Sequence, residues 1–143
     1  MARLVRSTTI HARAEDIFDF LQEKSHIPEF WPSMLEVSAV EDLPNGGKKY
    51  HYQYKMAGLR FEGDSEEIEV IPNRKIVARN DKGIEGTVTW VLDEHGSNTD
   101  VTLEMNYKVP IPVLGKINER AAHQFNEHEA NTIIANLKTQ IEA

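Results

Sequence analysis

The sequence contains no cysteine, which removes disulfides, a thiolate nucleophile and any metal site built on sulfur. No apolar run approaches the roughly 20 residues that a membrane-spanning helix needs. The segment 1–10 carries Arg3 and Arg6 and lacks the apolar core of a signal peptide. These absences predict a cytoplasmic protein without membrane insertion.

Clustered positive charge is also scarce, because the net charge is −7. The nearest basic group, Lys48, Lys49 and Lys55, is diluted by the acidic residues of 62–69. Proteins that bind nucleic acid gain most of their affinity by neutralising phosphates, so no nucleic-acid partner is expected.

What is present is ordinary globular composition. The chain has 143 residues, of which 40% are hydrophobic and 27% charged. A chain of this length can bury a stable core without disulfides or structural metals. No repeat or linker-like stretch divides it. We therefore expect one domain over residues 1–143.

Alternating apolar and polar residues fill most of the chain and predict an α+β protein in the order βααββββββα. We expect strands over 1–10, 35–43, 50–56, 59–70, 75–80, 84–92 and 101–109, with a β-bulge near 65–67. Short helices are expected over 13–22 and 25–30, the second capped by Ser25. After Pro112 a continuous helix is expected to run to about Ile141, roughly 40 Å. One face of the sheet needs a cover, and only this helix is large enough.

This order resembles the helix-grip fold of the START-like (SRPBCC) superfamily: a curved, seven-stranded antiparallel sheet around a long C-terminal helix. Three stretches carry the resemblance and are similar to its polyketide cyclase/dehydrase and lipid-transport branch. They are HARAEDIFDFLQEKSHIPEFWPSM (11–34), YKMAGLRFEGDSEEIEVIPNRKIV (54–77) and ANLKTQIEA (135–143). The resemblance implies a cavity between sheet and helix, and it leaves binding and catalysis open.

Large apolar and tyrosine side chains lie on the strand faces that we expect to point inward. They are Tyr50, Tyr52, Tyr54, Met56, Phe61, Trp90, Leu103, Met105 and Tyr107. Tyrosine and tryptophan offer apolar bodies with polar tips, and methionine adapts to irregular shapes, which suits a mixed-character ligand. The alternative is that these residues only fill a tight core.

One stripe at spacings of three and four residues runs along the expected long helix. Its members are Glu119, His123, Asn126, Ala130, Ile134, Leu137 and Ile141. The first three are polar and would anchor a ligand head group if the stripe covers a pocket; otherwise they are solvated. A second stripe, Ile117, Ala121 and Phe125, would contact the short helices or a second copy of the chain.

Signals for catalysis and for metals are weak. The row Glu119, His123 and Glu127 has a spacing that can hold a metal, but exposed rows of this kind are far more common and no zinc signature is present. No nucleophile motif or phosphate loop occurs. The acidic group around the bulge, Asp64, Glu66, Glu67 and Glu69, is expected to face solvent. We therefore predict no metal site, no cofactor and no catalytic residue.

The leading hypothesis is binding or transport of a small hydrophobic or amphipathic ligand: a lipid, polyketide, isoprenoid or quinone-like compound. The first alternative is a polyketide cyclase or dehydratase that uses a pocket histidine or tyrosine. The second is an interaction module acting through the Ile117, Ala121 and Phe125 stripe, which includes a homodimer.

Overall fold

The computed structural model describes residues 1–143 and contains one antiparallel sheet of seven strands. The strands are β1 (Ala2–Ile10), β2 (Met34–Asp42), β3 (Lys48–Met56), β4 (Leu59–Ile71), β5 (Lys75–Asp81), β6 (Gly86–His95) and β7 (Asn98–Tyr107). Their spatial order is β1-β7-β6-β5-β4-β3-β2, so consecutive strands from β2 to β7 are neighbours while β1 and β2 form opposite edges.

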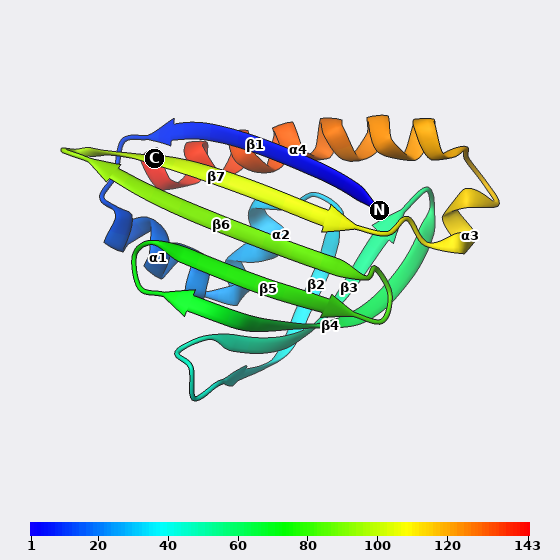
Figure 1. Ribbon diagram of the computed structural model, residues 1–143, viewed down its shortest axis with the longest axis horizontal. Helices are drawn as coiled ribbons and strands as arrows, with labels where there is room; N and C mark the ends of the chain where they lie inside the picture. The colour runs from blue at the N-terminus through cyan, green and yellow to red at the C-terminus, as the bar shows by residue number, and fades with distance from the viewer.

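Helical segments connect the strands or follow the last of them. They are α1 (Ala14–Gln22), the 3₁₀ turn η1 (Lys24–His26), α2 (Ile27–Phe30), α3 (Ile111–Leu114) and α4 (Glu119–Glu142). Between β1 and β2 the chain must cross the whole sheet, and α1, η1 and α2 make that crossing behind it (Figure 1). Helix α4 runs alongside β1 and also contacts α2. The predicted α+β helix-grip architecture and element order are confirmed.

Alternation along the strands decides which side chains face the helices. Val101, Leu103 and Met105 of β7 are buried, and the residues between them are partly exposed. From α4, Ile133, Ile134 and Leu137 are buried in the same apolar cluster. The core is thus the layer between the concave sheet and the helices.

The β-bulge lies at the edge of its predicted position. Strand β4 is continuous, and its register against β5 shifts between Glu67 and Glu69. Ser65 and Glu67 therefore point to the same inward face of the sheet as Gly63, whereas Ile68 is 44% exposed. The prediction that Glu67 faces solvent with its acidic neighbours is wrong, because the strand does not change parity until after it.

The predicted continuous C-terminal helix is divided. Helix α3 ends at Leu114 beside Gly115, and α4 begins after Asn118, whose side chain accepts a hydrogen bond from Ala121 N at 2.7 Å. A capping asparagine starts a new helix because it satisfies one of the free N–H groups of the first turn. Near the N-terminus, Ser25 is not a helix cap: it lies inside η1, and Glu23 accepts from Ser25 N.

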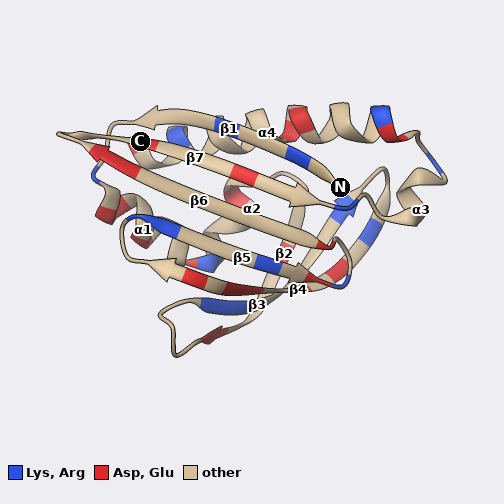
Figure 2. Cartoon of the chain, viewed as in Figure 1, with Lys and Arg blue, Asp and Glu red and all other residues tan.

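Charged residues of both signs are interspersed over the strands and α4 (Figure 2). Opposite charges pair across neighbouring strands, as Arg79 of β5 does with Glu66 of β4 at 3.3 Å. No helix combines the length and hydropathy needed to cross a bilayer.

Candidate functional site

A cavity lies between the concave face of the sheet, α2 and α4. Its volume is about 90 Å³. Its walls comprise 25 residues, of which 17 are hydrophobic. An apolar cavity with few polar groups is the usual form of a small-molecule site.

Strand β3 supplies one wall through its inward residues. Tyr50, Tyr52, Tyr54 and Met56 alternate along it, are all buried and all line the cavity. Tyr50 and Tyr54 are four residues apart, about 13 Å along the strand. The tyrosine hydroxyls therefore reach different parts of the cavity.

An ion pair closes one part of the cavity. Lys24 Nζ donates to Glu67 Oε2 at 2.6 Å and to Leu21 O at 2.9 Å, and the Lys24 and Glu67 side chains are only 5% and 2% exposed. Backbone Lys48 N donates to the other oxygen of Glu67 at 2.8 Å. Burial lowers the pKa of Lys24, and the negative charge of Glu67 opposes that shift.

A second polar group is formed by α4 and β3. Glu129 Oε2 accepts from the Tyr54 hydroxyl at 2.9 Å, and its Oε1 accepts from Ser33 N at 2.9 Å. Burial and the charge of Glu129 raise the pKa of Tyr54 well above 10.0, so Tyr54 stays protonated near neutral pH. Burial also raises the pKa of Tyr50 to about 12.

Asn126 also reaches the cavity, as the stripe on the helix predicts. Its Nδ2 donates to the Tyr107 hydroxyl at 2.8 Å. Trp90 and Met105 line the same space from β6 and β7. The structure thus brings together most of the residues selected from the sequence, although their role in binding stays a prediction.

Four of the selected residues stand outside the lining: Phe61, Leu103, Glu119 and His123. Leu103 is buried in the core, and Phe61 is only partly buried. Glu119 is exposed at the first turn of α4, and the side chain of His123 is 41% exposed and pairs with Glu127 at 2.9 Å. The buried face of α4 passes through Ala122, Asn126 and Glu129, so the predicted stripe was out of phase at its N-terminal end.

Four residues that line the cavity were not predicted from the sequence: Lys24, Ser65, Glu67 and Glu129. Charged residues are rarely buried without a partner, and the partner cannot be identified from the sequence. A single charged residue is therefore expected on the surface. The parity of β4 through Gly63, and the spacing of Glu129 three residues after Asn126, were the available signals.

Aromatic residues at the end of α2 also form part of the site. Phe30 and Trp31 are buried and line the cavity, and the rings of Phe30 and Trp90 meet edge to face with centroids 6.2 Å apart. Trp31 Nε1 and Ser65 Oγ are buried without a hydrogen-bond partner. Both residues line the cavity, and each of these atoms lies near a tyrosine hydroxyl, Trp31 near Tyr54 and Ser65 near Tyr50, without full hydrogen-bond geometry.

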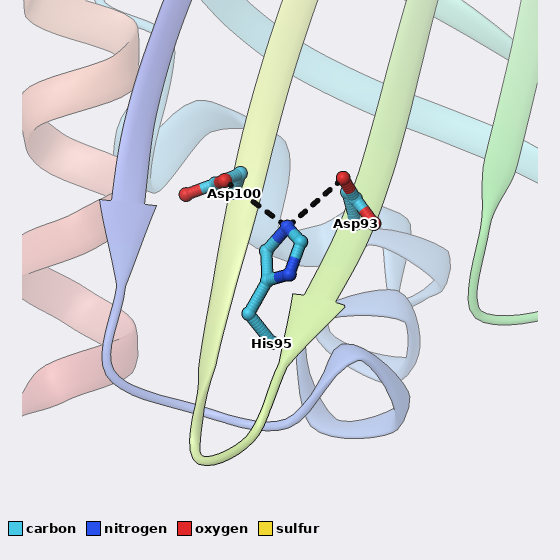
Figure 3. Close-up of side chains that lie close together, drawn as sticks. All are labelled: Asp93, His95 and Asp100. Atoms are coloured by element: carbon cyan, nitrogen blue, oxygen red, sulfur yellow. Dashed lines mark hydrogen bonds and ion pairs between the residues drawn. The ribbon is translucent and has the colours of Figure 1, made fainter.

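A separate cluster lies on the hairpin between β6 and β7 (Figure 3). His95 Nε2 is 3.0 Å from Asp93 Oδ2 and 3.5 Å from Asp100 Oδ2. The three ligand atoms are close enough to hold a cation, but all three residues are exposed, and Asp100 also accepts a hydrogen bond from Thr9 Oγ1 at 2.7 Å. An exposed ion-pair group accounts for this geometry.

Comparisons with known proteins agree with this architecture. The family model described as polyketide cyclase / dehydrase and lipid transport matches residues 1–142. The chain therefore belongs to this family. Membership supports a role in hydrophobic-ligand binding or cyclisation. A search of curated proteins gave no match.

Solved structures share the fold over nearly the whole chain. TTHA0849 from Thermus thermophilus is 15% identical with a TM-score of 0.82, covering 98% of this chain and 97% of that one. The Zhui aromatase/cyclase from Streptomyces sp. R1128 is 14% identical with a TM-score of 0.78, covering 99% and 93%. A START superfamily protein from Mycobacterium smegmatis is 15% identical with a TM-score of 0.75, covering 96% and 98%.

Proposed function

We propose that this protein binds or transports a small hydrophobic or amphipathic molecule in the cavity between the sheet and α4. The observation that carries the proposal is the cavity itself, an apolar space with a few buried polar groups at separate places on its wall. Family membership and the START-like fold support the same function. The ligand classes that we expect are lipids, polyketides, isoprenoids and quinone-like compounds.

The energetics are sufficient for binding without special chemistry. Burial of eight methylene groups contributes on the order of 6 kcal/mol, before the losses of association are subtracted. Met34, Met56 and Met105 line the cavity and can change rotamer to fit a ligand. Because these side chains are flexible, we expect the cavity of about 90 Å³ to enlarge around a longer ligand.

An enzyme of cyclase or dehydratase type is the second candidate. The pairs Lys24–Glu67 and Tyr54–Glu129 favour it, because ionisable groups inside an apolar cavity can move protons. The raised pKa of Tyr54 keeps its hydroxyl protonated, so near neutral pH it can donate a hydrogen bond to a substrate, but it is a weak general acid and no base. His123, the histidine that the cyclase alternative would use as an acid or base, pairs with Glu127 at 2.9 Å and does not line the cavity, so binding ranks first.

A cavity-filling variant tests the binding function. Val88 lines the cavity, and Val91 lies on the same strand with 39% exposure. We expect wild-type protein and Val91→Trp to bind the neutral fluorescent dye N-phenyl-1-naphthylamine. Val88→Trp should bind it about tenfold more weakly, because the added ring occupies the site.

Circular dichroism and thermal melting establish that both variants are folded. No dye binding by wild-type protein, or equal binding by the two variants, would count against the cavity. The enzyme alternative is separated by recovering a bound poly-β-ketone after incubation: a carrier returns it unchanged, and a cyclase returns a product.

A further inference from the structure

We propose that the cavity selects uncharged ligands that present hydrogen-bond acceptors, such as ketones, quinones and esters, and discriminates against carboxylates such as fatty-acid anions. The inference rests on the proposed binding function and adds the chemical class of the ligand. It follows from two properties of the wall: its net charge and its unused hydrogen-bonding capacity.

The charge comes from three ionisable side chains besides the tyrosines: Lys24, Glu67 and Glu129. Lys24 and Glu67 neutralise each other at 2.6 Å. Glu129 has no cation within ion-pair distance, and its two oxygens accept hydrogen bonds from Ser33 N and from the Tyr54 hydroxyl. One cation and two carboxylates leave a formal charge of −1, which repels a buried anion strongly where water is scarce.

The carboxylates on the wall already accept hydrogen bonds from the protein. Glu67 accepts from Lys24 Nζ and from Lys48 N, and Glu129 accepts from Tyr54 and from Ser33 N. Each oxygen keeps a second lone pair, so a donor on the ligand would share an acceptor that a protein donor already uses. The carboxylates therefore favour a ligand donor less than unpaired acceptors would.

Donors, in contrast, are only loosely engaged. Trp31 Nε1, which can only donate, lies near the Tyr54 hydroxyl but outside hydrogen-bond geometry. Ser65 Oγ lies near the Tyr50 hydroxyl, also outside that geometry. The ammonium of Lys24 has three N–H groups and two acceptors, Leu21 O and Glu67 Oε2. A buried donor without a partner is costly, so a ligand oxygen that accepts from it is favoured.

A carboxylate also offers acceptors, so the charge of the cavity is what separates the two classes. Lys24 cannot fully neutralise a carboxylate on the ligand, because its charge is already neutralised by Glu67. A neutral carbonyl oxygen takes the same hydrogen bonds without the repulsion from Glu129. The wall therefore favours acceptors that carry no charge.

Ligands with matched chains measure this selectivity directly. We expect 2-undecanone to displace N-phenyl-1-naphthylamine from wild-type protein at a concentration about tenfold or more below that required for decanoate, a ratio that corresponds to about 1.4 kcal/mol. Decyltrimethylammonium, which has the same chain length and the opposite charge, should also displace the dye more readily than decanoate. These comparisons need no variant.

Glu129→Gln identifies the source of the selectivity. The amide keeps the shape of the side chain, accepts from Ser33 N and can donate to the Tyr54 hydroxyl, which then rotates. The variant should narrow the ratio between decanoate and 2-undecanone several-fold. Glu127→Gln is the matched control: it lies on the same helix, its side chain is 43% exposed, and it should leave the ratio unchanged.

Decanoate binding as well as or better than 2-undecanone, with the dye still bound, would overturn the inference and leave the binding function standing. An unchanged ratio in folded Glu129→Gln would overturn it too. If neither the dye nor any ligand binds, the proposed function fails and the inference fails with it. If Glu129→Gln does not fold, the wild-type series alone decides.

Discussion

Replacing Lys24 by methionine should destabilise the protein far more than an ordinary loss of an ion pair. The pair that Lys24 makes with Glu67 has an N···O distance of 2.6 Å, and its side chains are 5% and 2% exposed. Methionine keeps the unbranched apolar part of the lysine side chain and removes the ammonium group. Glu67 is then a buried charge with one remaining hydrogen-bond donor, Lys48 N. Removal of one partner from a buried pair costs about 3–5 kcal/mol of the free energy of unfolding.

The same reasoning predicts that a second substitution rescues the first. Glu67→Gln removes the uncompensated charge and keeps an oxygen for Lys48 N, so the Lys24→Met, Glu67→Gln double variant should be more stable than Lys24→Met alone. A buried pair that is replaced as a whole is often nearly neutral to stability. The coupling between the sites should be about 2 kcal/mol or more.

Denaturant unfolding followed by circular dichroism measures these free energies. Lys75→Met is the matched control, because Lys75 pairs with Glu69 at 3.3 Å while both side chains stay 38% and 48% exposed. That control should lose no more than about 1 kcal/mol. A loss below about 1 kcal/mol in Lys24→Met, or no rescue by Glu67→Gln, would show that Lys24 and Glu67 do not depend on each other for burial.

Three further predictions concern pH, the helix start and the exposed stripe. Burial raises the pKa of Tyr50 to about 12. The stability that Tyr50 contributes is therefore complete below pH 10 and is lost as the pH rises toward 12. In a series of unfolding curves over this pH range, the free energy of unfolding should fall by roughly 3 kcal/mol. Tyr50→Phe should reduce this fall, and an unchanged dependence on pH in the variant would contradict the prediction. Asn118→Ala should lower the free energy of unfolding by about 1 kcal/mol because it removes the cap of α4, whereas no loss would show that the cap is dispensable. Phe125 is 43% exposed, so Phe125→Asp should shift the protein to a smaller size in size-exclusion chromatography if the stripe mates with a second copy, and an unaffected monomer removes that alternative.

Much of the architecture could be predicted because it depends on periodicity. The alternation of Tyr50, Tyr52 and Tyr54 with polar residues places them on one face of a strand, and the sheet needs a cover on that face. The break before α4 was missed because Ile117 and Val113 continue a helical spacing of apolar residues. Gly115 and the capping geometry of Asn118 decide against it.

The charged part of the site could not be predicted from single residues. Whether Glu67 is buried depends on Lys24, which is 43 positions away in the sequence and meets it only after the sheet has closed. The helix posed a different difficulty. A small error in phase at its N-terminal end placed His123 on the wrong side, while Asn126 closer to its middle was placed correctly.

Native mass spectrometry of the protein purified from cells shows whether the cavity holds a ligand. We expect a wild-type species that retains a small hydrophobic molecule, and loss of that molecule in folded Val88→Trp but not in Val91→Trp. Wild-type protein that carries nothing and takes up no 2-undecanone when the ketone is added would contradict the proposed function.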